Sequence, residues 1–275
     1  MMRERVITAA VGIPLVVAAI HYGYIPFLLL TLAIVTLGLL EYFALMRARG
    51  HRPFTGIGLA AGILLVTTLF LNGVVPAVPD RVLNPGIGFV ISVLLILLVL
   101  RAMSRSNPEE AWPAFLVTAG GLFYVAWLLA HLMLLRELRP WGRPLTYFLF
   151  IAIWVMDTAA FVFGIRYGRR KLAQTLSAGK SVEGFFAGLA AAVVVALIFK
   201  WLVFKPFSIT ACVMMGLLVG VLGPLGDLSE SLIKRYAGVK DSGVLLPGHG
   251  GVLDRFDSFF FTAPILYYTV RVFLT

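Results

Sequence analysis

The sequence predicts an all-α polytopic membrane protein, and three observations lead to this fold class. Hydrophobic residues make up 60% of the 275 residues and charged residues only 13%, whereas a soluble domain has about one quarter charged residues. The mean hydropathy is +0.97. Apolar runs of about 20 residues, the length that crosses a bilayer as a helix, recur along the chain. No polar stretch between them is long enough to form a separate soluble domain.

The apolar runs predict about nine transmembrane helices, separated by charged or Gly/Pro-rich breaks. They are expected near residues 6–22, 25–46, 55–73, 86–103, 113–135, 145–164, 184–204, 208–233 and 256–274. The run at 86–103 is the weakest of these as a full span. We divide the chain into an N-terminal transmembrane scaffold, 1–144, and a C-terminal catalytic region, 145–275, with polar loops at 165–183 and 234–255.

The basic residues predict the orientation of these spans. Cytoplasmic loops are enriched in Lys and Arg, and with the N-terminus inside and the C-terminus outside, 16 of the 23 Lys and Arg residues fall on the inner side. The loop at 136–143, with three arginines on the outer side, is the exception. This rule accounts for the net charge of +10 without nucleic-acid binding. We expect a protein of a bacterial cytoplasmic membrane whose two polar loops face the cytoplasm.

The acidic residues indicate where the chemistry takes place. Seven of the 13 lie in the second half of the chain, in or beside the last spans and polar loops: Asp157, Glu183, Asp227, Glu230, Asp241, Asp254 and Asp257. A charged residue at mid-membrane depth costs about 2.5–3.5 kcal/mol on insertion scales. The concentration of acids therefore indicates a functional site.

Four polar residues form a stripe on the predicted helix that ends near residue 233. Asp227, Glu230, Ser231 and Lys234 are spaced i, i+3, i+4 and i+7, which places them on one helix face. One interpretation is an ordinary Glu230–Lys234 ion pair at the membrane surface. That pair leaves Asp227 without a partner, and a bound metal ion would supply one.

A glycine-rich loop, 240–257, leads into the last predicted helix. Its glycines let backbone N–H groups approach an anion closely. Ordinary helix capping would explain Asp254 and Asp257, and a turn would explain His249. Capping does not explain the mixed charges of Lys240, Asp241 and Arg255, which an anion site with a divalent metal would explain. The sequence contains neither a G-x-x-x-x-G-K-[ST] phosphate loop nor a nucleophile elbow.

The residues from 231 to 257 resemble the signature of the phosphatidate cytidylyltransferases. The matching positions are Ser231-x-Ile233-Lys234-Arg235, Lys240-Asp241-x-Gly243 and Leu246-Pro247-x-His249-Gly250-Gly251-Val252-x-Asp254-Arg255-Phe256-Asp257. The segment Ser177-Ala178-Gly179-Lys180-Ser181-Val182-Glu183-Gly184 is similar to a second family motif, with Ala178 where the family has Pro. The resemblance covers residues 150–275, and the first five spans match only as a hydrophobic scaffold.

The resemblance implies that CTP and phosphatidate react to give CDP-diacylglycerol and pyrophosphate, with Mg²⁺ as cofactor. It implies metal binding by Asp227 and Asp254, with Asp257 and Glu230 in or next to the coordination sphere. The implied catalytic residues are Lys234, Arg235, Lys240, Asp241, His249 and Arg255, and those implied to bind substrate are Asp157, Ser177, Lys180, Ser181, Glu183, Gly250 and Gly251. A monovalent cation at the site and a homodimer stay open.

Two other functions stay open from the residues alone. One is a cytidylyltransferase or CTP-dependent kinase that acts on another lipid. The other is a transporter of a phosphorylated solute with ion-coupling acids near the membrane midplane. The acids of this chain flank a glycine-rich loop at helix ends, which favours an enzyme.

Overall fold

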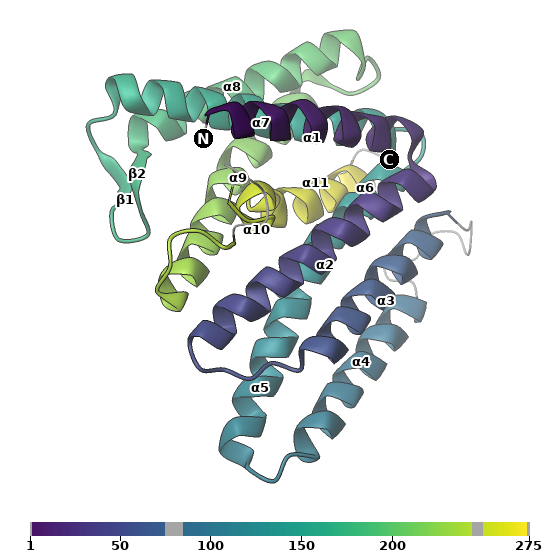
Figure 1. Cartoon of the computed structure of the whole chain (residues 1–275). Coiled ribbons are helices and arrows are strands. Elements are labelled where there is room, and N and C mark those ends of the chain that lie inside the picture. Colours follow the sequence, from purple (N-terminus) through teal and green to yellow (C-terminus); the bar gives the residue numbers. More distant parts are fainter. Residues whose placement is uncertain (1, 75–84, 244–249, 274–275) are drawn as a thin grey trace.

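The computed structural model describes residues 2–74, 85–243 and 250–273 (Figure 1), and each of the nine predicted apolar runs contains helix. The helices are α1 (Met2–Tyr22), α2 (Tyr24–Ala48), α3 (Thr55–Val74), α4 (Pro85–Met103), α5 (Pro108–Gly121), α6 (Leu128–Glu137), α7 (Gly142–Tyr167), α8 (Val182–Leu202), α9 (Ile209–Ala237), α10 (Leu253–Phe256) and α11 (Phe259–Phe273). A π-helical segment, η1 (Leu122–Trp127), joins α5 to α6.

The helix boundaries follow local sequence signals. Ser181 precedes α8 and its hydroxyl accepts a hydrogen bond from Gly184 N at 3.1 Å, and Ser208 caps α9 in the same way. Such side chains satisfy N–H groups that have no partner inside the helix. At its other end α9 stops at Gly238, whose φ of 76° is the left-handed conformation that glycine adopts readily. The predicted boundaries therefore lie within a few residues of the observed ones.

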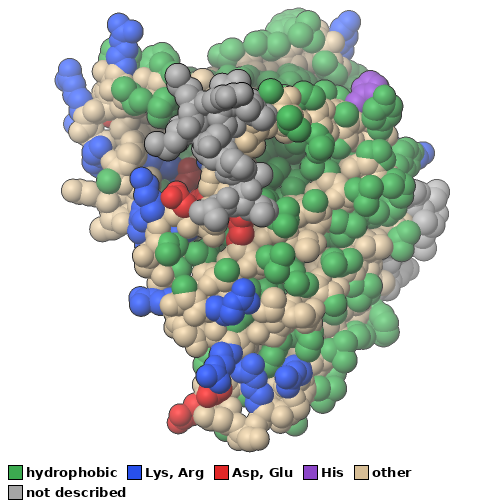
Figure 2. All heavy atoms as spheres, viewed as in Figure 1, with side chains coloured by type: hydrophobic (Ala, Val, Ile, Leu, Met, Phe, Trp, Pro, Cys, Tyr) green, Lys and Arg blue, Asp and Glu red, His purple; other side chains and the backbone are tan. Residues whose placement is uncertain are grey.

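Six of the described helical segments are long and apolar enough to cross a membrane. They span residues 24–48, 86–103, 108–137, 142–167, 182–202 and 209–237. The chain is thus an integral membrane protein, and apolar side chains cover much of the face in Figure 2. The count of nine spans is not confirmed. With 15 residues, α11 is about 22 Å long, less than the roughly 30 Å hydrocarbon layer.

The loops that the orientation rule assigns to the inner side contact one another. Arg49, in the loop after α2, donates to the backbone carbonyl of Tyr236 at the end of α9, and Arg105 donates to the carbonyl of Arg52. At the opposite ends of these helices, Arg136 donates to the carbonyl of Ile20. The two sets of loops therefore lie at different ends of the bundle. Which end faces the cytoplasm remains a prediction.

The loop predicted at 165–183 contains a feature that the all-α expectation did not include. Residues Lys171–Ala173 form β1, which pairs antiparallel with β2, Ser177–Ser181. In Figure 1 this hairpin extends beyond the helices at the side where α7 and α8 meet. Helix α7 packs along α8, and α8 packs along α9, so the hairpin is held at the end of a three-helix layer.

Candidate functional site

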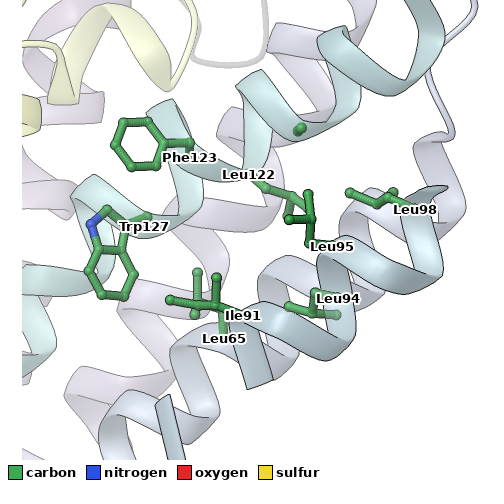
Figure 3. A pocket seen from close by; sticks show the side chains of 9 residues that line it. Leu65, Ile91, Leu94, Leu95, Leu98, Leu122, Phe123 and Trp127 are labelled. Carbon is green, nitrogen blue, oxygen red and sulfur yellow. The ribbon is translucent and has the colours of Figure 1, made fainter. Parts of the chain in front are cut away.

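Two pockets of the described structure differ in chemistry. One lies between α3, α4 and the η1 region and has a volume of about 340 Å³. Figure 3 shows its lining of aliphatic and aromatic side chains, among them Leu65, Ile91, Leu95, Phe123 and Trp127. These side chains offer no acid, base or phosphate-binding cation. This pocket cannot carry the predicted chemistry.

The second pocket, of about 440 Å³, brings together residues that the sequence predicted separately. It is lined by residues of α7, the hairpin, α8 and α9, including Asp157, Ser177, Lys180, Ser181 and Asp227. Asp157 is 70 residues from Asp227 along the chain, and the hairpin lies between them. The fold therefore joins the predicted substrate-binding segment to the head of the polar stripe on α9.

The closest contact across this pocket is an ion pair between Lys180 and Asp227. Lys180 Nζ lies 2.6 Å from Asp227 Oδ2, and the side chains are 23% and 31% exposed. The second carboxylate oxygen of Asp227 accepts a longer hydrogen bond, 3.4 Å, from the Ser231 hydroxyl. Asp227, which sequence reasoning left without a protein partner, is thus paired by the hairpin.

Two other residues of the same segment order the backbone around the pocket. Glu183 accepts hydrogen bonds from Arg169 N at 3.0 Å and Arg170 N at 3.3 Å, and Ser181 caps α8. Arg235 donates from α9 to the carbonyl of Leu176 at 3.2 Å, which ties the hairpin to that helix. These contacts fix the position from which Lys180 reaches Asp227.

A second cluster centres on Lys234, one turn below Glu230. Lys234 Nζ is 2.6 Å from both Glu230 Oε2 and Asp254 Oδ1. The side chains of Lys234, Glu230 and Asp254 are only 11%, 1% and 9% exposed. No donor in the described ranges reaches Glu230 Oε1. The predicted Glu230–Lys234 pair exists, but it is buried and shared with the glycine-rich loop.

Asp254 organises the described parts of that loop. Its Oδ2 accepts hydrogen bonds from Gly251 N at 2.8 Å, Ser242 N at 3.0 Å and the Ser242 hydroxyl at 2.9 Å. Burial alone would raise the pKa of Asp254, but the Lys234 ammonium and the Gly251 and Ser242 hydrogen bonds lower it below its ordinary value. The carboxylate is therefore held ionised beside Lys234.

Asp257 lies between α10 and α11 and faces the other acids. Burial raises the pKa of Asp257 well above its ordinary value. The carboxylates of Asp227, Glu230 and Asp157 raise it further. Gly226 permits this proximity, because a Cβ there would overlap the carbonyl of Asp257. The alternative that Asp254 and Asp257 cap the start of one helix does not fit the structure, because α10 ends at Phe256 and α11 starts at Phe259.

Sequence reasoning missed Glu41, a buried carboxylate on α2. Its Oε1 accepts from Val252 N at 2.8 Å, and its Oε2 accepts from Leu253 N at 2.9 Å and from the Ser242 hydroxyl at 3.1 Å. The signal was present, because Glu41 is the acid of the apolar run at 25–46. Glu41 lies far from the seven acids in the second half of the chain, so their concentration did not indicate it.

The remaining predicted residues lie around these two clusters. Lys240, Asp241 and Arg255 are exposed, and Figure 2 shows acidic side chains close to Lys and Arg side chains in the left half of this face. Gly250 has a φ of 81°. His249 lies outside the described residues. Within the described ranges, no three His, Cys, Asp or Glu side chains are grouped as a metal site.

Comparison with known proteins extends over the whole chain. Residues 3–273 match the family model described as "Cytidylyltransferase family". A protein of Synechocystis sp. named phosphatidate cytidylyltransferase is 33% identical, and the alignment covers 100% of this chain and 98% of the relative. A protein of the same name from Bacillus subtilis is 31% identical over 99% of this chain and 98% of the relative. One from Staphylococcus aureus (strain COL) is 41% identical over 56% of this chain and 59% of its own length.

Proposed function

The chain belongs to the cytidylyltransferase family, and from this we propose that it transfers a cytidylyl group from CTP to phosphatidate, giving CDP-diacylglycerol and pyrophosphate. Full-length similarity to relatives named phosphatidate cytidylyltransferase supports this choice. The observation that carries the proposal is the convergence of Lys180, Asp227 and the Lys234 cluster at the ends of membrane helices.

The reaction needs alignment and charge neutralisation more than a strong base. A phosphate monoester has a second pKa near 6, so the attacking oxygen of phosphatidate is largely ionised at neutral pH. This oxygen bonds to the α-phosphorus of CTP, the bond from that phosphorus to the bridging oxygen of the β-phosphate breaks, and pyrophosphate leaves with the electron pair. Transfer of this type is accelerated mainly by positioning and electrostatics.

The cations of the site have separate roles in this proposal. Lys180 lies in the pocket, where an incoming phosphate would compete with Asp227 for its ammonium. Lys234 holds Asp254 and Glu230 in place. The exposed Lys240 and Arg255 neutralise the triphosphate and the phosphatidate headgroup, and Arg235 keeps the hairpin on α9. The acyl chains stay in the bilayer throughout.

The charge of the site fits a bound Mg²⁺. Asp157, Asp227, Glu230, Asp254 and Asp257 gather around Lys180 and Lys234, so a divalent cation would add positive charge beside the triphosphate. Carboxylate oxygens are the ligands that Mg²⁺ prefers, and Glu230 Oε1 is a buried oxygen without a donor in the described residues. Asp227 and Asp254 would hold the ion, with Glu230 and Asp257 beside them. When bound, it would neutralise the phosphates. Participation of a monovalent cation is a question for ion titration.

The assay that tests the function follows both products. Purified protein in mixed micelles receives CTP and Mg²⁺ with and without phosphatidate. We expect pyrophosphate and CDP-diacylglycerol in equal amounts, and only with phosphatidate present. A CTP-dependent lipid kinase would release CDP instead, and reaction with an isoprenoid phosphate but not phosphatidate would assign another lipid. Either result contradicts the proposal.

The proposed orientation puts the hairpin in the cytoplasm of a bacterial cell. Gly179 is exposed, and a side chain there would meet no other atoms. Arg143, at the start of α7, is exposed beyond the opposite end. In a Cys212→Ser background, we expect an impermeant thiol reagent to label Gly179→Cys only from the cytoplasmic side and Arg143→Cys only from the other. Reversed labelling would place the site in a compartment without CTP and would contradict the proposal.

A further inference from the structure

Glu41 connects the N-terminal scaffold to the catalytic loop although it lies more than 180 residues before that loop. It occupies the cytoplasmic half of α2 in the proposed orientation and is 9% exposed. Both of its oxygens accept backbone hydrogen bonds, from Val252 N at 2.8 Å and Leu253 N at 2.9 Å. The contact therefore fixes the backbone that leads directly into Asp254 and Arg255.

The same carboxylate also reaches the other described part of the loop. The hydroxyl of Ser242 lies 3.1 Å from Glu41 Oε2 and 2.9 Å from Asp254 Oδ2. One hydroxyl proton thus serves two carboxylates, because a serine donates only one hydrogen bond at a time. Asp254 in turn contacts Lys234 at 2.6 Å. A continuous set of contacts runs from Glu41 through Ser242 and Asp254 to Lys234.

The fit around Glu41 leaves no space for a side chain at two positions of the loop. A Cβ at Gly251 would overlap the Ser242 hydroxyl and lie 2.5 Å from Glu41 Oε2. A Cβ at Gly243 would lie 2.8 Å from Glu41 Oε1. Gly243 and Gly251 thus let the chain close around the carboxylate from both sides.

We propose that Glu41 is a positioning residue of the cytidylyl transfer, which sets the backbone at 251–253 and, through Ser242, the orientation of Asp254. This proposal rests on the proposed function. Glu41 does not line the pocket of Asp157 and Lys180, so we assign it no contact with substrate. Loss of Glu41 should lower kcat, because a small misplacement of a group that must align with the reacting atoms slows the reaction.

The first test compares two isosteric substitutions of buried glutamates. Glu41→Gln keeps the shape but replaces one of the two acceptor oxygens with an amide NH₂ group, so it can accept from only one of Val252 N and Leu253 N. Glu137→Gln is the matched control, because Glu137 is also buried, 8% exposed, but contacts Tyr24 N and Arg136 at the opposite end of the bundle. Both variants are purified in detergent, and Tm, kcat and the KM for CTP are measured.

We expect Glu41→Gln to lose kcat on the order of tenfold to a hundredfold, the range seen when partners that orient a ligating group are removed. The KM for CTP should change little. Glu137→Gln should lower Tm to a similar extent while kcat stays at the wild-type value. Equal kcat values for the two variants, at matched folded fractions, would overturn the positioning role.

Amide hydrogen exchange gives a second readout that does not depend on turnover. In Glu41→Gln one of the Val252 and Leu253 amides should exchange at least about tenfold faster than in wild type, because glutamine keeps only one of the two acceptor oxygens. In Glu137→Gln they should exchange as in wild type. If Glu41→Gln leaves both amides protected, the inference is wrong even if activity falls. If instead wild type makes no CDP-diacylglycerol, the proposed function fails while the exchange experiment still tests the contact.

Discussion

The two lysines of the site make contacts of the same length in different surroundings. Lys180 reaches Asp227 at 2.6 Å from a hairpin, and both side chains keep a quarter to a third of their exposure. Lys234 reaches Glu230 and Asp254 at 2.6 Å from within α9, where all three side chains are nearly buried. An incoming phosphate can displace the Asp227 carboxylate from Lys180. The carboxylates around Lys234 are nearly buried, so a phosphate cannot reach that lysine to displace them. The exposed pair is suited to exchange, and the buried cluster is suited to hold geometry.

The largest effect should follow from removing the buried cation. Lys234→Met leaves the Glu230 and Asp254 carboxylates facing each other without a counter-charge. Breaking a buried pair in this way destabilises a protein by about 3–5 kcal/mol, so we expect a large fall in Tm and loss of activity. Lys200→Met is the control, since Lys200 is a partly exposed lysine of α8 that donates only to the Lys205 carbonyl in the described contacts. A Lys234→Met protein as stable as the control would show that the buried cluster does not hold the geometry of the site.

The next largest effect should be confined to activity. Asp227→Asn keeps the shape of the side chain but removes a charge from the proposed Mg²⁺ site. We expect kcat/KM to fall by at least about a hundredfold with little change in Tm, since the Lys180–Asp227 pair is partly exposed. The measurement is a Mg²⁺ titration of turnover. Near wild-type turnover across the titration would exclude Asp227 as a ligand.

The smallest effect should come from the exposed cation. Lys180→Ala breaks a partly exposed pair, so its free energy of unfolding should change by less than about 1 kcal/mol. We expect the KM for CTP to rise by roughly tenfold, equal to about 1.4 kcal/mol of ground-state binding, while kcat changes less. If Lys180→Ala instead reproduced the full loss of Asp227→Asn, the role of Asp227 would be to hold Lys180 and not to bind a metal.

Sequence patterns predicted the helices and the Glu230–Lys234 pair, but not the pairing of Lys180 with Asp227. Apolar runs predict where helices form, because a chain segment in lipid must satisfy its backbone hydrogen bonds internally. Asp227 and Lys234 were identified from helical spacing, and Lys180 from the resemblance of residues 177–184 to a family motif. The Lys180–Asp227 contact joins positions 47 residues apart, and no local pattern encodes it. The hairpin was missed because its strands, three and five residues long, carry little periodicity. Glu41 was missed because every partner that gives it a role comes from the far end of the chain.

The contact between Glu41 and the loop has a consequence for biosynthesis. Ser242, the first of its donors to be made, follows Glu41 by 201 residues, so at about 5–20 residues per second the ribosome needs roughly ten to forty seconds to make it after Glu41. Throughout that interval a nascent helix holds a carboxyl group whose native donors do not yet exist. The last tenth of the polypeptide therefore completes the packing of the first helices. If translation stalls before this segment is made, the resulting helix bundle contains a buried carboxyl group without its backbone donors.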